Sequence, residues 1–216
     1  MLEVHGISKS FGVLQVLHDV SLRLDRGQVT TLVGTSGVGK TTLLRIIAGL
    51  ERADAGEVVI DGETATRGGT ILSPPHRRTL GFVFQAPALW PHMTVAKNIL
   101  FAVTHLNAAA RSHRLAGLLR ATGLEPLATR YPSEISAGQA RRVALARTLA
   151  AAPCYLLMDE PFSNLDPQAK QDLIRLALDH VRDGSMGLLY VTHDPSEREL
   201  IGGNILLLRD GVLTAG

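Results

Sequence analysis

A glycine-rich loop near residue 40 has the composition of a phosphate-binding site. Its glycines let the backbone turn its N–H groups inward and let an anion approach closely. Lys40 supplies a positive charge for the β- and γ-phosphates of a nucleotide, and the Thr41 hydroxyl can ligate Mg²⁺. The helix expected after the loop would aim its N-terminus at the same anion. The predicted nucleotide ligands of this segment are Gly34, Thr35, Ser36, Gly37, Val38, Gly39, Lys40, Thr41 and Thr42.

Two carboxylates follow an apolar run at residues 155–158. Asp159 could hold Mg²⁺ directly or through water, and Glu160 lies where a general base could polarise an attacking water. Alone, the two acids could simply end a strand before the turn at Pro161. The upstream loop, however, matches the Walker A pattern at every fixed position. The pair therefore predicts the Walker B element of the same site.

A third segment, residues 135–139, reads Ile-Ser-Ala-Gly-Gln and is followed by Arg-rich sequence at 141–147. It resembles the LSGGQ signature motif of the ABC ATPase family, which general P-loop proteins lack, and the resemblance covers essentially the whole chain. The segment departs from the usual signature motif at Ile135, which replaces Leu, and at Ala137, which replaces Gly. At Ala137 a β-carbon near a phosphate could lower the affinity for it. The resemblance implies that Ser136, Gly138 and Gln139 bind ATP held by another subunit, so that two chains enclose two ATP molecules head to tail.

Further positions resemble family elements in the expected order. Gln85 resembles the Q-loop glutamine that senses Mg²⁺ and water, and His193 the switch histidine that contacts the γ-phosphate. Phe11 lies where the family places an aromatic that stacks on adenine, and residues 163–166 resemble the D-loop that faces the other subunit. Singly, Gln85 could be a strand-end polar group, His193 a cap and Phe11 a core aromatic. The resemblance implies catalysis by Glu160, His193, Gln85 and Lys40, and Mg²⁺ ligation by Thr41, Gln85 and Asp159.

The apolar pattern places these residues in an α/β fold. Consecutive apolar residues at 30–33, 80–84, 156–158 and 188–192 are typical of central strands in a parallel sheet. Helices are expected over residues 40–48, ended by Gly49, and after Asp166 and Pro167, with Gly184 past the end. A short apolar face at residues 115–119 indicates a further helix, closed by Gly123. Asp61-Gly62 and Asp210-Gly211 predict hairpin turns near the two ends of the chain.

The expected architecture combines these elements with the resemblance. The fold class is α/β, a P-loop NTPase core with a mostly parallel sheet, an N-terminal antiparallel β subdomain and an inserted α-helical subdomain. Residues 1–216 are expected to form a single ABC ATPase domain. Within it, residues 1–94 and 153–216 form the RecA-like core with its antiparallel part, and residues 95–152 form the helical signature subdomain.

Composition limits the partners and the location. The net charge of +2 gives no argument for nucleic acid. No stretch approaches about 18 uncharged apolar residues, and the N-terminus lacks a signal-peptide pattern. The one cysteine, Cys154, cannot form an internal disulfide and is expected to be a core thiol. We therefore expect a cytoplasmic chain, with partners that supply any channel. The resemblance implies that it is peripheral on the cytoplasmic face of the cell membrane.

The function that the resemblance implies is ATP binding and hydrolysis that power an ABC membrane transporter. Residues 84–95 and 163–166 resemble bacterial importers of small solutes or inorganic ions. The implied partners are a second ABC ATPase subunit in a homodimer, transmembrane permease subunits and, through the permease, a solute-binding protein. Leu89 and Trp90 are expected near the groove for a permease helix, although Trp90 could be ordinary core. Because the chain ends soon after the hairpin at residues 205–213, an added C-terminal regulatory domain is not expected.

Other functions remain open at this point. The ATPase could serve an exporter or a lipid- or protein-release complex, or act on ribosomes as a soluble ABC protein, although such proteins usually carry two cassettes. A DNA-repair head would need a long coiled coil before the signature, and residues 49–136 are too few and lack heptads. A binding module without hydrolysis is disfavoured by Glu160 and His193.

Overall fold

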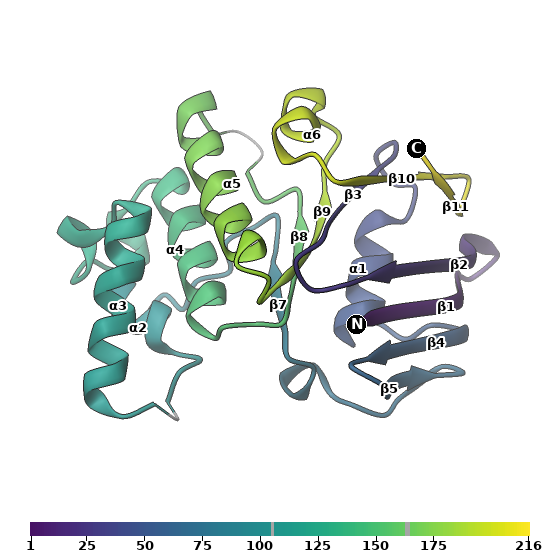
Figure 1. The fold of residues 1–216 in the computed structure, drawn as a ribbon, viewed down its shortest axis with the longest axis horizontal. Coiled ribbons are helices and arrows are strands. Elements are labelled where there is room, and N and C mark those ends of the chain that lie inside the picture. The colour runs from purple at the N-terminus through teal and green to yellow at the C-terminus, as the bar shows by residue number, and fades with distance from the viewer. Residues whose placement is uncertain (105, 163–164) are drawn as a thin grey trace. The chain divides into compact units, whose positions relative to one another are not determined.

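The computed structural model describes residues 1–104, 106–162 and 165–216. Contacts divide the chain into two compact units (Figure 1). The first unit contains Met1–Phe82, Cys154–Glu160 and Leu178–Gly216. The second contains Val83–Pro153 and Pro161–Ala177.

One sheet of the first unit is antiparallel throughout, with the strand order β2-β1-β4-β5-β6. Its strands are β1 (Leu2–Phe11), β2 (Leu14–Leu24), β4 (Ala55–Ile60), β5 (Glu63–Arg67) and β6 (Thr70–Ile71). The predicted turn at Asp61 and Gly62 joins β4 to β5, and both residues have the positive φ that a tight hairpin requires. In β1 the buried residues do not simply alternate, because the pairing register shifts between Val4 and Ile7, around Gly6.

The other sheet has the order β11-β10-β3-β9-β8-β7 and is mostly parallel. Its strands are β3 (Val29–Val33), β7 (Leu80–Val83), β8 (Tyr155–Asp159), β9 (Gly187–Val191), β10 (Asn204–Arg209) and β11 (Val212–Ala215). Strands β10, β3, β9 and β8 pair in parallel, and β11 turns back antiparallel at Asp210-Gly211 as predicted. Every residue of β8 and β9 is buried, which confirms the central strands expected from their apolar runs.

Helix α1 (Lys40–Ala48) belongs to a core that both sheets share. Its Leu43, Leu44, Ile46 and Ile47 are fully buried in one cluster with residues of the antiparallel sheet and of β3, β8 and β9. The helix ends at Gly49 as predicted, in a left-handed conformation with φ 74°. A short helix, α6 (Pro195–Ile201), follows β9 in the same unit.

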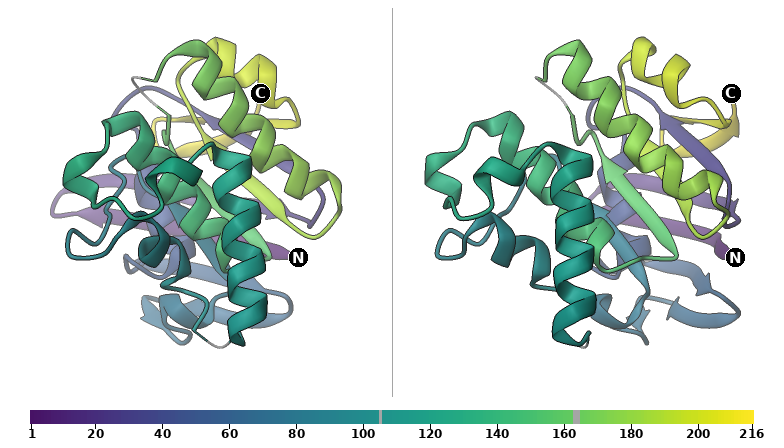
Figure 2. Two further views of the ribbon diagram at one scale, coloured as in Figure 1. Left: turned by 90° about the vertical axis from the view of Figure 1, so that its left-hand side faces the viewer. Right: turned by 60° about the vertical axis from the view of Figure 1, so that its left-hand side comes forward.

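The second unit is helical. It contains α2 (Val95–Leu100), α3 (Ala108–Thr122), α4 (Ala137–Ala150) and the first part of α5 (Pro167–Arg182). Helices α2, α3 and α4 pack on one another, as the teal and green ribbons of Figure 2 show. Arg114 Nη1 donates to the carbonyl of Ala150 at 2.7 Å, and Arg142 Nη1 to that of Thr122 at 3.3 Å. Each arginine thus binds the negative C-terminal end of the neighbouring helix.

The predicted helix boundaries of this region also hold. Gly123 ends α3 in a left-handed conformation, and Asp166 accepts a hydrogen bond from the Ala169 N–H at 2.9 Å, so that it caps the start of α5. Three short 3₁₀ helices complete the described elements: Pro75–Arg77, Glu125–Leu127 and Pro132–Glu134.

The fold class is confirmed: an α/β protein with a mostly parallel sheet, an antiparallel sheet and added helices. One prediction needs correction, because Cys154 lies just before β8 and is partly exposed rather than buried in the core. Among the helices that the structure describes, none is both long and apolar enough to span a membrane.

Candidate nucleotide-binding site

The glycine-rich loop connects β3 to α1, and the space around each of its glycines differs. A Cβ on Gly34 would overlap with the Leu208 carbonyl oxygen, and one on Gly39 would lie 2.8 Å from Val16 Cγ1. At Gly37, which has φ 80°, a Cβ would meet nothing within 4 Å, so the loop is open on that side. Gly39 precedes α1 and has no side chain that could cap it, which leaves the first N–H groups of the helix available to an anion.

Lys40 closes this loop. Its ammonium donates to the carbonyl oxygens of Gly34 at 2.8 Å and Thr35 at 2.9 Å, and lies 3.9 Å from Glu160 Oε1. Burial lowers the pKa of Lys40, and the carboxylates of Glu160 and Asp159 oppose that shift. A buried ammonium with neutral carbonyl partners gains from an incoming phosphate, which offers it a full negative charge.

Asp159, at the end of β8, lies beside the first turn of α1. Thr41 Oγ1 donates to Asp159 Oδ1 at 3.0 Å. Burial raises the pKa of the Asp159 carboxyl, and the hydrogen bond from Thr41 opposes that shift. A hydroxyl and a carboxylate at this spacing are hard oxygen donors, the ligand type that Mg²⁺ prefers, so the residues present fit the predicted metal.

Glu160 is held in an unusual backbone conformation. Its φ of 43° is uncommon for a residue with a side chain, and its N–H donates to the Val191 carbonyl at 3.1 Å. Its Oε2 lies 3.1 Å from Nδ1 of His193, which follows β9. The Glu160 carboxylate therefore has the Lys40 ammonium near one oxygen and the His193 imidazole near the other. Backbone outliers of this kind concentrate at functional sites, because only a surrounding structure can maintain them.

His193 and the phosphate loop share a pocket. The pocket has a volume of about 400 Å³ and is lined by Gly34 and Thr35 of the loop and by His193. The remaining lining residues are Val33, Asp194, Pro195, Arg198 and Leu207. Of the sequence-predicted residues of the first unit, Gly34, Thr35 and His193 line this pocket. Lys40 is linked to it through Glu160, which contacts both Lys40 and His193.

Phe11 lies at the end of β1 and is 50% exposed, so its interpretation as a core aromatic is wrong. Lys9 Nζ lies 4.9 Å from the centre of its ring, a cation–π contact. Leu14, at the start of β2, is also exposed. The Phe11 ring is therefore accessible at the surface. Its stacking on adenine stays a prediction.

The other predicted ligands belong to the second unit. Gln85 follows β7 and is exposed. Ser136 caps α4, because its Oγ accepts the Gln139 N–H at 3.2 Å while Gln139 Oε1 accepts the Ser136 N–H at 2.9 Å. Ala137 is the first residue of α4 and is exposed, and a Cβ on Gly138 would lie 3.0 Å from Leu165 Cδ2. The roles of these residues at a nucleotide stay predictions, and Ser163 and Asn164 of the expected D-loop lie outside the described residues.

The segment after Gln85 presents aromatic rings outward. Trp90 is 42% exposed, with its ring 5.2 Å from that of Phe101, so the interpretation of Trp90 as ordinary core is wrong. Arg147 of α4 holds the backbone just before Trp90, because its guanidinium donates to the carbonyls of Ala88 at 2.9 Å and Pro87 at 3.1 Å. Helix α4, which begins at Ser136, is thereby tied to the segment that follows Gln85.

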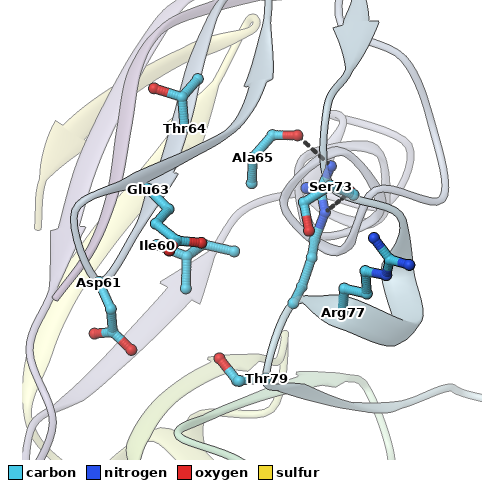
Figure 3. Close-up of a pocket in the computed structure, with 9 residues that line it drawn as sticks. Ile60, Asp61, Glu63, Thr64, Ala65, Ser73, Arg77 and Thr79 are labelled. Carbon is cyan, nitrogen blue, oxygen red and sulfur yellow. Dashed lines mark hydrogen bonds between the residues drawn. The ribbon is translucent and has the colours of Figure 1, made fainter.

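Arg78, which was not among the predicted site residues, supports the phosphate loop from the far end of α1. Arg78 is 2% exposed and lies beside a pocket of about 230 Å³ bordered by β4, β5 and residues 73–79 (Figure 3). Its guanidinium binds the carbonyls of Ile46 and Ile47 at the end of α1, at 3.3 Å and 2.7 Å. Further bonds reach Ser73 O at 2.8 Å, Ala65 O at 3.0 Å and Thr66 Oγ1 at 2.7 Å. An Arg that follows another Arg in a polar stretch gives no local signal for this role.

Comparisons with known proteins agree on one family. A profile of the ABC transporter family matches residues 17–163. The Fe(3+) ions import ATP-binding protein FbpC 3 of Rhodococcus jostii is 41% identical over 213 residues, which are 98% of this chain and 60% of that protein. The sulfate/thiosulfate import ATP-binding protein CysA of Escherichia coli is 43% identical over 216 residues, covering 97% of this chain and 58% of that protein. The chain thus spans less than two thirds of these curated relatives.

Solved structures give the same result. The structure of an ATP-binding subunit of an ABC transporter matches with a TM-score of 0.89 and 28% identity, covering 100% of this chain and 88% of that one. The dimeric post-hydrolysis structure of the ATP-binding cassette MJ0796, bound to ADP and Pi, matches with a TM-score of 0.86 and 29% identity, covering 100% and 98%. With the family profile matching more than half of its residues, this chain belongs to the ABC transporter family.

Proposed function

We propose that this chain binds ATP with Mg²⁺, hydrolyses it, and powers an ABC importer of a small solute or inorganic ion. The observation that carries the proposal is the position of Glu160. Its carboxylate lies 3.9 Å from Lys40 Nζ and 3.1 Å from His193 Nδ1, at the edge of a loop built for phosphates. A carboxylate so placed can accept a proton from water, while Lys40 stabilises the charge of the phosphates.

The metal would be held by Thr41 and Asp159, whose hydroxyl and carboxylate lie 3.0 Å apart. The role of Gln85 as a further ligand stays a prediction. Bound Mg²⁺ would neutralise charge on the β- and γ-phosphates. Within the described ranges, no group of three His, Cys, Asp or Glu side chains could hold a metal ion. That fits a Mg²⁺ bound by one carboxylate, a hydroxyl and the nucleotide itself.

The predicted assembly has two ATPase subunits and a permease. Ser136 and the N-terminus of α4 are exposed, so they can face an ATP bound to a second copy of the chain. The dimeric state of the related cassette MJ0796 supports this arrangement. We further propose that residues 95–152 form the helical subdomain that carries this signature element.

The importer assignment rests on the relatives FbpC and CysA, which are import ATP-binding proteins for Fe(3+) ions and for sulfate or thiosulfate. A subunit that hydrolyses ATP for import acts at the cytoplasmic face of the membrane, where ATP is present. Permease subunits would supply the channel and, with a solute-binding protein, the choice of cargo. Trp90 and Phe101 form an exposed aromatic pair where such a permease could bind.

The hydrolysis step is tested by replacing Glu160 with Gln. Because this change removes the base but keeps the shape of the side chain, turnover should fall roughly 10²–10⁴-fold while ATP binding is retained. Glu199→Gln, at an exposed residue of α6, serves as the matched control and should keep wild-type turnover. Unchanged phosphate release by the Glu160→Gln chain would contradict the assignment.

The transport step is tested with the same variant as bait. The tagged Glu160→Gln chain would be purified with MgATP from detergent-solubilised membranes of its host, with the nucleotide-free wild type as control. A multi-span permease found only with the ATP-bound variant is the expected result. Recovery of ribosomes or other soluble partners alone would leave the ATPase in place and overturn the transport function.

A further inference from the structure

Glu197 has a buried carboxylate, close to His193 in the sequence, that the proposed chemistry does not use. Glu197 of α6 is 3% exposed, and its Oε2 accepts hydrogen bonds from Thr192 Oγ1 at 2.5 Å and from the Tyr190 hydroxyl at 3.1 Å. Burying a carboxylate costs free energy unless hydrogen bonds compensate for the lost water. Both donors lie within the last residues before His193, so these two bonds connect the buried carboxylate to that point of the chain.

The hydrogen bonds among Thr192, Asp194 and Glu197 resemble a helix capping box in which the Thr192 hydroxyl stands between the other two residues. In an ordinary capping box the Glu at the third helical position accepts the N–H of the capping residue directly. Here Asp194 caps α6 and Glu197 occupies the third position, but the Asp194 N–H donates to Thr192 Oγ1 at 3.0 Å. The Thr192 hydroxyl in turn donates a hydrogen bond to Glu197 Oε2. The residues on both sides of His193 are therefore fixed to one buried carboxylate.

The imidazole itself depends on this anchoring. The His193 side chain is 60% exposed, so packing does little to fix it, yet its Nδ1 lies 3.1 Å from Glu160 Oε2. The neighbouring Asp194 carboxylate is engaged with the start of α6, where Oδ1 accepts from the Ser196 N–H at 2.9 Å and hydroxyl at 2.7 Å. The backbone at residues 192–194 thus determines where the imidazole can reach.

We propose that Glu197 is a positioning residue for ATP hydrolysis: through Thr192 it holds the backbone that places His193 beside Glu160. This inference rests on the proposed function, in which His193 and Glu160 act on the attacking water and the γ-phosphate. Glu197 does not touch the nucleotide. Its contribution lies in the geometry of the reacting groups rather than in ATP affinity.

The first test compares two substitutions on the same helix in the full-length chain. Glu197→Met keeps the side-chain length and removes the acceptor, and Glu199→Met makes the same change at an exposed residue. Because misplacing a reacting group by about 1 Å can cost on the order of 10²-fold, kcat of Glu197→Met should fall about 10- to 100-fold. The KM for ATP should stay within about twofold, since binding by the loop is untouched. Glu197→Gln, which retains an acceptor oxygen, should recover most of the activity.

The second test is a double-mutant cycle, which a merely structural role would not satisfy. In a His193→Ala background, Glu197→Met should lower kcat by less than about twofold further, because the residue it positions is gone. A full additional loss, or unchanged kcat in Glu197→Met alone, would overturn the inference. If Glu197→Met does not fold, Thr192→Val breaks the same relay at nearly constant volume and is judged by the same criteria.

Failure of this inference can be told from failure of the proposed function. If Glu160→Gln and His193→Ala both keep wild-type turnover, the proposed catalytic groups are wrong. If those two variants lose turnover and Glu197→Met does not, only the role of Glu197 is wrong.

Discussion

The strongest stability prediction concerns Arg78, whose guanidinium binds the C-terminal end of the phosphate-loop helix. Burial lowers the pKa of Arg78 to about 10, which reflects the cost of holding this cation away from water. A shift of that size from the ordinary value of 12.5 corresponds to about 3 kcal/mol, which the folded state must offset. Hydrogen bonds from a charged group contribute about 1.5–3 kcal/mol each, and Arg78 donates five. The bonds therefore outweigh the cost.

Replacing Arg78 by Met removes both effects and leaves acceptors buried without a donor. The carbonyls of Ile47, Ala65 and Ser73 lose their short bonds, and each stranded group costs about 1–3 kcal/mol. Relief of the desolvation cost of about 3 kcal/mol offsets part of this loss. We expect the free energy of unfolding to fall by about 3–5 kcal/mol, which is a large fraction of the stability of a typical domain.

Urea unfolding followed by circular dichroism measures this change. Arg77→Met is the matched control, because Arg77 is the exposed neighbour of Arg78, and it should change the free energy by less than about 0.5 kcal/mol. Arg78→Lys, with a smaller and non-planar donor group, should lie between the wild type and Arg78→Met. A loss below about 1 kcal/mol in Arg78→Met would refute the reasoning, since it would mean that the bonds only balance the desolvation cost.

Three further predictions concern other parts of the first unit. Gly49→Ala should lower the free energy of unfolding by about 2 kcal/mol, because a Cβ at φ 74° is strained and would lie 2.6 Å from the Arg78 guanidinium carbon; an unchanged urea midpoint would contradict this. Burial alone would raise the pKa of Asp61, but hydrogen bonds from the N-terminus, Tyr155 and Arg26 lower it to about 2. Its stabilising effect is therefore present above the unfolded pKa of about 3.9 and is lost as the pH falls through the folded value. Asp61→Asn should cost roughly 1 kcal/mol at pH 7, after allowance for solvent screening, and less at pH 3, and a pH-independent difference would be the contrary result. Thr41→Val should raise the Mg²⁺ concentration for half-maximal turnover at least about tenfold, and an unchanged Mg²⁺ titration would remove Thr41 from the metal site.

The elements that could be predicted from the sequence are those whose signal is local. The phosphate loop is specified by glycines within eight consecutive positions, and Gly49 and Gly123 end their helices as expected. Strands β8 and β9 were predictable because burial on both faces requires an unbroken apolar run. Strand β1 was not, since the register shift around Gly6 breaks the alternation that identifies a half-buried strand.

The remaining features depend on contacts between distant segments. Arg78 meets the end of α1 more than thirty residues earlier in the chain, and no pattern around it shows that it is buried. The positive φ of Glu160 follows from the placement of β8 beside β9, where its N–H finds the Val191 carbonyl. Glu197 could be recognised as a possible third residue of a helix, but not as the acceptor of a relay through Thr192.

The two ends of α1 show why such a distant contact is required. A helix that binds phosphate must leave its N-terminal N–H groups uncapped, and α1 has neither a side-chain cap nor an acidic residue in its first turn. The helix is also only nine residues long, too short to be stable by itself in water. Its stability must therefore come from the opposite end and from its buried face. Arg45 lies in its last turn, Gly49 closes it, and Arg78 places a buried positive charge on its negative pole. The N-terminal end can stay uncapped because the C-terminal end is held by Gly49 and by the buried guanidinium of Arg78, a residue distant from the glycine-rich loop in the sequence.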